Sequence, residues 1–512
     1  MMIGEGGWMS GAWLLVAVLA VPAVGAAAVA LVPARLDRAG RVLATVVAAV
    51  TLGLTVALGL QRSDVGWTSY GTTPTVLPWT QLDVDWVPAL DLEFHLGVDG
   101  VSYPLLLLTA LLTLLCCAYT VHRVPAGGSG RSLAALLLVL EVGILGTFLA
   151  LDLVLFFLFF EVVLLPMYAV IVGWGGDDRR HAARKFVLYT LFGSVLLLLG
   201  VFTVVAATGT ADIVELTGGV GMSRTVQLTA FGLFAVAFAV KAPLWPLHTW
   251  LPDAHTQAPT VGSVVLAGVL LKMGTYGLIR VAVGVAPQGA RWAAPALGVL
   301  AVAAIIIGSL VCLRQTEIKR LIAYSSVGHM GFVLLGIATL TATGLQAALI
   351  GNVAHGVITG LLFFLAGALK DRAHTGELAE LGGLRESAPR LAGLLGFAAV
   401  ASLGLPGLAG FWGEAFAVVA AVQRGGPLWI TLAVLAAAGG ALTAAYFLRL
   451  LRRVTHGPAS SAVAGLRHPR PSGAEWLAWA PLVVLALAIG LVPALVLAGS
   501  AGPVDALTGV LR

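Results

Sequence analysis

The sequence predicts an all-α integral membrane protein with about 14 transmembrane helices. Of its 512 residues, 59% are hydrophobic and 10% are charged, whereas charged residues make up roughly 25% of a typical soluble domain. Long apolar windows follow one another along the whole chain, and basic residues concentrate in alternate connections between them. The Arg residues thus belong to short interhelical loops. We therefore expect one membrane body in a lipid bilayer and no nucleic-acid partner, despite the net charge of +5.

The predicted spans are windows of roughly 20 apolar residues. They lie at about 11–33, 41–60, 100–121, 131–150, 153–173, 185–207, 227–250, 259–283, 293–313, 320–340, 344–369, 389–423, 428–449 and 475–499. If the N-terminus is outside, 21 of the 29 Lys and Arg residues fall in inside connections, six fall outside, and two lie within spans. This asymmetry supports fourteen spans with both termini outside. No Lys or Arg precedes the first window, so we expect a retained helix there and not a cleaved signal peptide.

The longest outside connection, 61–99, carries six acidic residues and one Arg. Its polar and apolar residues alternate around Leu82–Trp86, and alternation of this kind is typical of a β-strand. We expect a short hairpin there.

Two of the predicted helices are interrupted. In the seventh span, Pro243 and Pro246 directly follow Lys241, and in the twelfth the glycine- and proline-rich run 404–410 precedes Glu414. Proline removes a helical hydrogen bond and clashes with the preceding turn. Such breaks are tolerated in a membrane where they line protein or water.

The two breaks lie five spans apart, and a unit of five helices inserts upside down when it is repeated. Spans 4–8 and 9–13 are therefore expected to form two inverted five-helix repeats with one broken helix each, an architecture common among transporters. The predicted organisation is 1–130 for helices 1–3 and the acidic loop, 131–283 for the first repeat, 284–455 for the second repeat, and 456–512 for the last loop and helix.

Two lysines lie near the middle of apolar spans. The chain has five Lys against 24 Arg, yet both cations at that depth, Lys241 and Lys272, are lysines. A desolvated lysine can lose its proton near neutral pH, whereas arginine keeps its charge. Ionisable groups in a membrane interior point to function, and these two favour proton transfer.

Other ionisable residues share this depth, and together they suggest a lateral relay for protons. The candidate site residues are Glu141, Glu161, Lys241, Lys272, His329, His355 and Glu414, with His248 near the break in the seventh span.

Structural explanations of the same residues stay open. Glu161 and Lys241 can form a static ion pair, and single membrane histidines often only hydrogen-bond between helices. Glu141 can support a neighbour and carry no proton itself, and the prolines can simply kink helices for packing.

No haem, flavin or iron–sulfur motif is present, and the three cysteines have neither metal-site nor disulfide spacing. We expect no redox centre, cofactor or metal in this chain.

Four segments resemble one known family. They are Phe160–Tyr168, Val240–His255 with the following Gln257–Thr260, Leu270–Gly277 and Ala323–Gly331. They are similar to motifs of the antiporter-like subunits of respiratory complex I, the NADH-quinone oxidoreductase, and of the wider Mrp antiporter group. The resemblance extends over roughly residues 90–455. Glu414 in the twelfth helix, and the absence of a long lateral helix after span fourteen, favour the subunit M branch, the counterpart of mitochondrial subunit 4.

The resemblance implies roles for the candidate residues. Glu161 and Lys241 would be a coupling pair, Lys272 the central carrier and Glu414 the terminal site, with His329 and His355 in the connecting axis. The chain would be a non-redox, proton-translocating subunit in a bacterial inner membrane, next to other antiporter-like subunits. NADH, FMN, iron–sulfur clusters and quinone would belong to partner subunits, and quinone reduction there would supply the energy.

Two other functions remain open at this stage. The chain can be a subunit of an Mrp-type cation/proton antiporter, or a structural membrane subunit whose charges no longer act.

Overall fold

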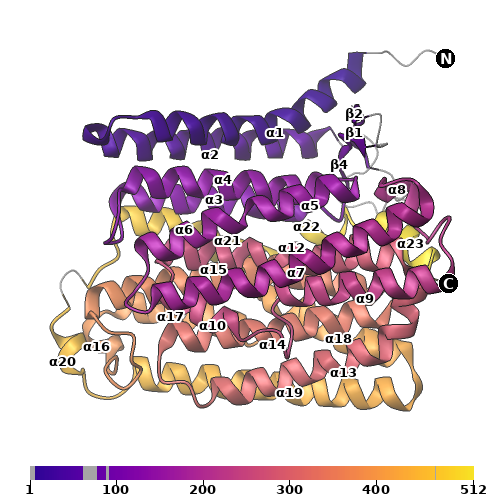
Figure 1. Ribbon diagram of the computed structural model, residues 1–512. Coiled ribbons are helices and arrows are strands. Elements are labelled where there is room, and N and C mark those ends of the chain that lie inside the picture. Colours follow the sequence, from indigo (N-terminus) through magenta and orange to yellow (C-terminus); the bar gives the residue numbers. More distant parts are fainter. Residues whose placement is uncertain (1–5, 62–77, 88–91, 467–468, 512) are drawn as a thin grey trace.

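The structure, a computed structural model, describes residues 6–61, 78–87, 92–466 and 469–511. Long helices run roughly side by side, and the first and last described segments lie at the same end of the bundle (Figure 1). Within the described residues, 13 helices are long and apolar enough to cross a membrane. The remaining predicted crossing, 389–423, consists of two shorter helices, as its glycine- and proline-rich run predicted.

The N-terminal helices form one flank of the bundle, drawn in indigo in Figure 1. The first pair packs against each other and against α4, and the third helix contacts the second and the fourth. These elements are α1 (Gly6–Leu31), η1 (Ala34–Leu36), α2 (Asp37–Leu60) and α3 (Tyr103–His122).

Eleven elements follow between residues 130 and 283. They are α4 (Gly130–Leu149), α5 (Leu153–Val162), α6 (Leu164–Trp174), α7 (Arg179–Thr208), α8 (Ile213–Leu216), α9 (Arg224–Lys241), α10 (Trp250–Gln257), α11 (Thr260–Val265), η3 (Leu266–Leu270), α12 (Leu271–Gly277) and η4 (Leu278–Val283). The break between α9 and α10 follows Lys241, as expected from the prolines. A second break, at Val163 between α5 and α6, was not expected.

The remaining helices complete the bundle. They are α13 (Pro287–Cys312), α14 (Ile318–Thr339), α15 (Ala342–Ala373), α16 (Leu384–Ser387), α17 (Pro389–Ser402), α18 (Ala409–Arg424), α19 (Gly426–Thr455), α20 (Ser461–Ala464), α21 (Gly473–Leu491), α22 (Ala494–Leu497) and α23 (Ala501–Gly509). Helices α13 and α19 lie on the flank opposite α1 and α2 (Figure 1).

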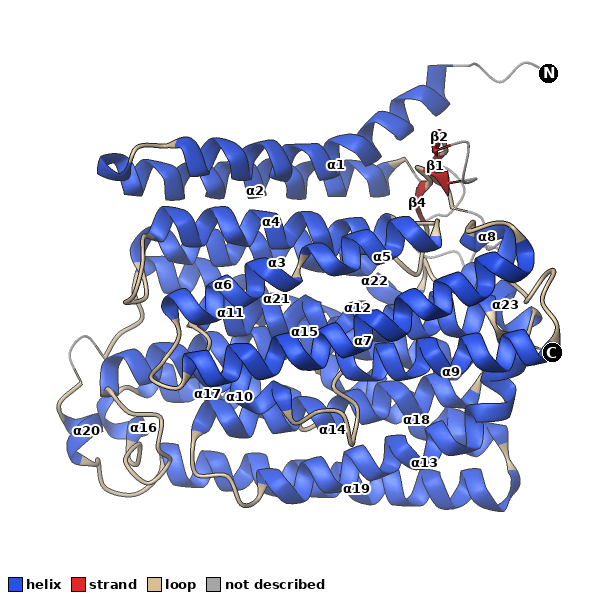
Figure 2. Ribbon diagram, in the orientation of Figure 1, coloured by secondary structure: helices blue, strands red, loops and turns tan. Residues whose placement is uncertain are grey.

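Short strands occur at one end of the bundle, which we call the strand end (Figure 2). They are β1 (Thr80–Leu82), β2 (Asp85–Val87), β3 (Leu92–Glu93) and β4 (Leu96–Val98). Strand β1 pairs antiparallel with β4, and β2 with β3. The segment around Leu82–Trp86 therefore contributes to two strand pairs, where the sequence predicted one hairpin. Residues 62–77 and 88–91 of the acidic loop lie outside the described residues.

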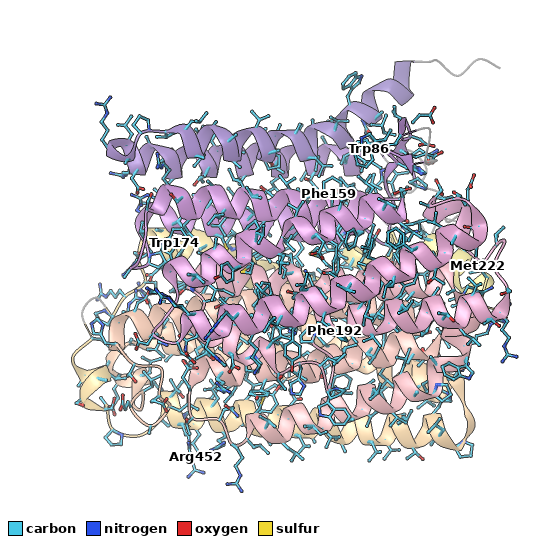
Figure 3. All side chains as sticks on the ribbon, in the orientation of Figure 1. Trp86, Phe159, Trp174, Phe192, Met222 and Arg452 are labelled. Atoms are coloured by element: carbon cyan, nitrogen blue, oxygen red, sulfur yellow. The ribbon has the colours of Figure 1, made fainter. Side chains whose placement is uncertain are left out.

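The opposite end holds α16 and α20 (Figure 1). It is called here the arginine end because Arg35 in η1, Arg179 at the start of α7 and Arg452 in the last turn of α19 lie there. Figure 3 shows Arg452 pointing away from the bundle at this end, while Phe192 points outward from the flank of α7. Phe192 is 54% exposed and has apolar exposed neighbours along the same helix. Such a face is suited to lipid and not to water.

The centre of the bundle is the continuous helix Thr260–Val283, formed by α11, η3, α12 and η4. It is entirely buried within the protein. It contains two π-helical segments, Leu266–Leu270 and Leu278–Val283, one on each side of α12. Segments of this kind are rare and frequently occur at functional sites. Lys272 lies between them.

Candidate functional site

Lys272 is fully buried, and its ammonium group has two neighbours. The Nζ atom donates to the backbone carbonyl of Ala267 and lies 2.7 Å from Nδ1 of His355 on α15. An unpaired charge at this depth would cost several kcal/mol. The His355 contact therefore gives the lysine a partner that can accept its proton.

Close backbone packing makes this contact possible. A Cβ atom at Gly356, the residue after His355, would lie 2.6 Å from the carbonyl oxygen of Gly268. Any larger residue at position 356 would push α15 away from the central helix. Glycine thus brings the histidine of one helix within reach of the lysine of another.

The polar chain continues from His355 to α14 and α18. The rings of His355 and His329 have centroids 5.7 Å apart, and both line a cavity of about 30 Å³ together with Glu414. About one water molecule fits such a volume. Nε2 of His355 has no hydrogen-bond partner among the described residues, so a water in this cavity would satisfy it.

His329 connects the cavity to the second broken helix. Its Nδ1 atom lies 2.8 Å from Oε1 of Glu414 on α18, and its Nε2 atom lies 3.0 Å from Oγ of Ser402 at the end of α17. The break between α17 and α18 therefore places both partners on one imidazole. Close approach of Gly413 to Gly351, where a Cβ would meet a backbone atom at 2.6 Å, holds α18 against α15.

The remaining predicted pair has a different geometry. Lys241, the last residue of α9, lies with Nζ 4.3 Å above the ring of Phe160. Glu161, the next residue, accepts a hydrogen bond from Ser194 on α7. In the described chain no direct ion pair joins Glu161 to Lys241. The Phe160 ring contacts the Lys241 ammonium, whereas the sequence had left a direct ion pair between Glu161 and Lys241 open.

Glu141 and His248 stand apart from these two groups. Glu141 is fully buried in α4, and neither carboxyl oxygen has a hydrogen-bond partner among the described residues. His248 follows the break after α9 and packs edge-to-face on Tyr324, with ring centroids 6.1 Å apart. The structure therefore brings Lys272, His355, His329 and Glu414 into one row, which we call the central row. It leaves Glu141 and His248 outside that row.

Comparisons with known proteins identify the family. Residues 150–439 match the family model described as NADH:quinone oxidoreductase/Mrp antiporter, TM. The NADH-quinone oxidoreductase subunit M of Rhodobacter capsulatus is 42% identical over 429 residues, which is 81% of each chain. A chain 4 of the NAD(P)H-quinone oxidoreductase of Trichormus variabilis is 37% identical over 492 residues, covering 94% of this chain and 89% of that one. This chain belongs to the antiporter-like family.

Solved structures of the family have the same fold. A chain of respiratory complex I from Thermus thermophilus superposes with a TM-score of 0.85 at 30% identity, covering 98% of this chain and all of that one. A chain of the Mrp complex from Dietzia sp. superposes with a TM-score of 0.81 at 25% identity over 98% of this chain. The matched family segment includes every candidate site residue except Glu141.

Sequence reasoning missed several members of this antiporter-like site. Ser194 and Ser402 are hydrogen-bond partners of candidate groups, and Phe160 contacts the Lys241 ammonium. A lone serine in an apolar helix gives no signal of its own. Ser402 had one weak signal, since it lies two residues before the run 404–410 that breaks the helix.

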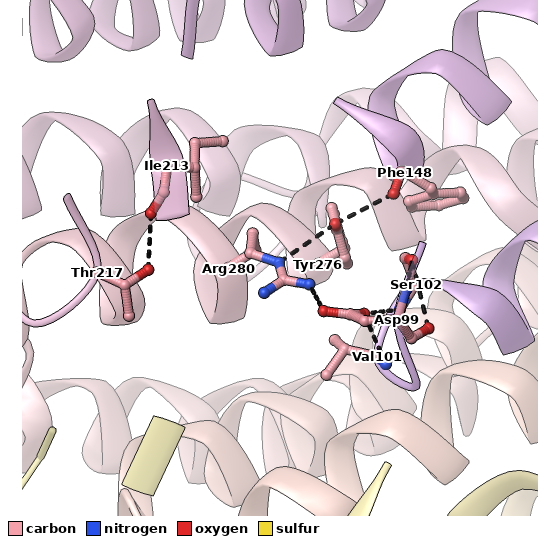
Figure 4. A network of polar contacts seen from close by, with 8 residues as sticks. All are labelled: Asp99, Val101, Ser102, Phe148, Ile213, Thr217, Tyr276 and Arg280. Atoms are coloured by element: carbon pink, nitrogen blue, oxygen red, sulfur yellow. Dashed lines mark hydrogen bonds and ion pairs between the residues drawn. The ribbon is translucent and has the colours of Figure 1, made fainter. Parts of the chain in front are cut away.

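A network of buried polar contacts surrounds the central helix at its strand end (Figure 4). Arg280, in η4, pairs with Asp99, and the Tyr276 hydroxyl donates to the carbonyl of Phe148 over 3.2 Å. Arg280 lies near the end of the predicted span 259–283, and its side chain is 7% exposed. Asp99 also accepts from the backbone of Val101 at 2.9 Å, so the pair is fixed on both sides.

A second ion pair lies outside the predicted spans at the same end. Nδ1 of His95 lies 2.6 Å from Oδ2 of Asp212, and Nε2 lies 3.3 Å from Oε1 of Gln81. Burial alone would lower the pKa of His95, but the hydrogen bond and charge of Asp212 raise it above its ordinary value. Burial raises the pKa of nearby Asp152 to about 6.

Proposed function

We propose that this chain is a proton-translocating membrane subunit of an NADH-quinone oxidoreductase. The single observation that carries the proposal is the central row, in which Lys272, His355, His329 and Glu414 are connected by two short contacts and a cavity for one water. The subunit sits in a bacterial inner membrane with both termini outside, because most Lys and Arg fall at the opposite end.

Proton transfer along the central row needs no new contacts beyond one water. The Lys272 ammonium gives a proton to Nδ1 of His355, and the resulting imidazolium releases its other proton from Nε2 into the cavity. Water passes a proton to His329, whose Nδ1 faces Glu414 at 2.8 Å. Each group returns to its starting charge once the proton moves on. The row thus carries a proton laterally between the two broken helices.

The pair of Glu161 and Lys241 sets the charge near one end of this row. A carboxylate close to Lys241 favours its protonated form, and a weaker carboxylate influence favours proton release. Because Glu161 is held by Ser194 on α7 and not by Lys241, small shifts of α7 against α9 change that influence. Movement of this kind is how a signal from a neighbouring subunit enters the relay.

The redox chemistry belongs to other subunits. An all-cysteine iron–sulfur cluster takes four thiolates, whereas this chain has three cysteines, two adjacent on α3 and one on α13. NADH, FMN, iron–sulfur clusters and quinone would be bound by partners, and quinone reduction there drives the subunit. Relatives named as subunits of that enzyme support this assembly.

The Mrp-type antiporter is the second candidate, because a chain of an Mrp complex has nearly the same fold. Purification of the tagged chain from its native membrane distinguishes the two. We expect NADH-oxidising, quinone-reducing activity to co-purify and NADH to drive proton uptake in vesicles. Sodium–proton exchange by the purified assembly, without co-purified NADH oxidation, would support the antiporter and reject the first proposal.

A further inference from the structure

A cavity of about 520 Å³ lies at the arginine end, and we call it the arginine-end cavity. Segments far apart in the sequence form its wall: the connection after α3, the end of α6, the turn between α10 and α11, the start of α14 and the end of α15. Figure 3 shows Trp174, one of the wall residues, at this end. Small-molecule sites have volumes of about 300–1,000 Å³, so the cavity has room for a ligand.

The wall of this cavity is positively charged. Arg123, Lys319 and Lys370 contribute three cations, and Asp371 contributes the one carboxylate among the described wall residues. The formal charge of those wall residues is therefore three minus one, or +2, with histidine neutral. Basic pockets between membrane helices are the kind of site that binds phosphate headgroups.

Lys319 is the cation that most needs an anion. Its side chain is buried, and its Nζ atom donates to the backbone carbonyl of Ala258 over 3.0 Å. Within the described part of the chain no ion pair joins Lys319 to a carboxylate. An ammonium group has three donors, and buried charges are normally paired. An anion in the cavity supplies the missing countercharge.

The other two cations are incompletely paired. Nζ of Lys370 lies 3.7 Å from Oε1 of Glu317, and Nη2 of Arg123 lies 3.8 Å from Oε1 of Glu475. Both distances exceed the length of a hydrogen bond. The other oxygen of Glu475 accepts from Arg372 at 2.7 Å, so this carboxylate is already engaged. Lys370 and Arg123 therefore keep donors for a ligand.

Two neutral donors belong to the same wall. Tyr119 and Trp174 both line the cavity and are buried. Neither the Tyr119 hydroxyl nor the Trp174 indole N–H has a hydrogen-bond partner among the described residues. A buried donor without an acceptor is unfavourable, and an indole N–H can only donate. The fitting ligand is therefore rich in acceptor oxygens. Five donor side chains exceed what the two oxygens of a carboxylate satisfy, whereas a phosphate group offers more oxygens.

We propose that the arginine-end cavity is a binding site for a phosphate group, carried by an anionic phospholipid or by free phosphate. Arg123, Lys319 and Lys370 neutralise its charge, and Tyr119 and Trp174 donate neutral hydrogen bonds to its oxygens. None of these five residues belongs to the central row. The site is therefore independent of the proposed proton transfer, and pumping is not its readout.

The test measures phosphate binding by the purified assembly that contains this chain. One lipid-depleted sample is dialysed to equilibrium against radiolabelled inorganic phosphate, and another is reconstituted in phosphatidylcholine vesicles that contain labelled phosphatidylglycerol. We expect the double variant Lys319→Gln/Lys370→Gln to bind label at least about tenfold more weakly than the wild type. Arg452→Gln/Arg453→Gln is the matched control, because it removes two exposed charges from the same end and keeps wild-type binding.

Tyr119→Phe removes one hydroxyl and keeps the ring, and it decides alone if the double variant does not assemble. A ligand that accepts from this hydroxyl binds more weakly in Tyr119→Phe, by a smaller factor than in the double variant. Loss of the phosphatidylglycerol label identifies a lipid and loss of the phosphate label alone identifies free phosphate, and either result supports the site. Wild-type binding of both labels in both variants overturns the site, as does a wild-type assembly that binds neither label.

Discussion

The breaks after α9 and before α18 hold their neighbouring ionisable groups in opposite ways. Next to the break after α9, Lys241 faces the ring of Phe160 and has no ion pair within the described chain. Next to the break before α18, Glu414 is hydrogen-bonded to His329, and through it to Ser402 and the water-sized cavity. Among the described residues, Lys241 thus has no polar partner beside its break, whereas Glu414 is hydrogen-bonded into the central row beside the other break.

This difference assigns two tasks, moving protons and responding to a signal, to different groups. A group that moves protons needs continuous donors and acceptors, and the central row has them. A group that responds to a signal needs a charge whose environment can change, and an ammonium on an aromatic ring is held by only about 0.5–2 kcal/mol. We infer that Lys241 responds to a change in its charged surroundings and that the central row conducts protons.

The largest expected effect comes from Lys272→Arg, which tests whether the row conducts. Arginine keeps the charge and roughly the size, but its guanidinium does not release a proton in the working pH range. We expect assembly to be retained, with the pumped-proton to electron ratio, or coupled turnover itself, falling markedly in reconstituted vesicles. Wild-type values for both would mean that Lys272 never deprotonates.

Lys241→Ala and Glu161→Ala test the sensing side of the comparison. Each is expected to abolish most proton pumping in an assembled complex, because each removes one of two opposite charges near the break. The ratio in vesicles is again the measurement, and Thr203→Ala on the exposed side of α7 is the control. A structural ion pair predicts a different result: loss of assembly in both variants, since an abandoned buried charge costs about 3–5 kcal/mol.

A smaller effect is expected where packing, and not chemistry, positions the row. In Gly413→Ala the added methyl meets the backbone of Gly351 at 2.6 Å, so α18 must move away from α15. We expect a partial loss of pumping, with thermal stability lowered by about 1–3 kcal/mol. Gly393→Ala is the matched control, because a Cβ there has nothing within 4 Å. Equal behaviour of the two variants would show that the close approach is unnecessary.

Much of this architecture follows from the sequence, since apolar windows and the charge asymmetry define spans whatever their neighbours are. The broken helices also follow, because Pro243, Pro246 and the run 404–410 act locally. Contacts between helices do not follow in the same way. The cavity between His355 and His329, and the ring of Phe160 beside Lys241, depend on how three or more helices pack. The inverted relation of the two halves and the domain limits remain predictions.

The smallest expected effect on pumping comes from the His95–Asp212 pair. This pair makes local stability depend on pH, and that dependence must be separated from any pH dependence of the two breaks. Because the pKa of His95 is raised in the folded protein, the His95–Asp212 pair stabilises fully below about pH 6.5, the unfolded value. That stabilisation is lost as pH rises through the higher folded pKa. Asp212 has a lowered pKa, so its own contribution is present above about pH 4 and is lost only in stronger acid.

Hydrogen exchange of segments 92–98 and 211–217, corrected for intrinsic rates, measures this local stability. We expect His95→Gln to lower protection by about 1.5–3 kcal/mol at pH 6, with the difference shrinking as pH rises through the folded pKa of His95, while pumping stays normal. A difference that is constant with pH would remove the pair as a source of pH dependence, and the broken helices would have to account for it.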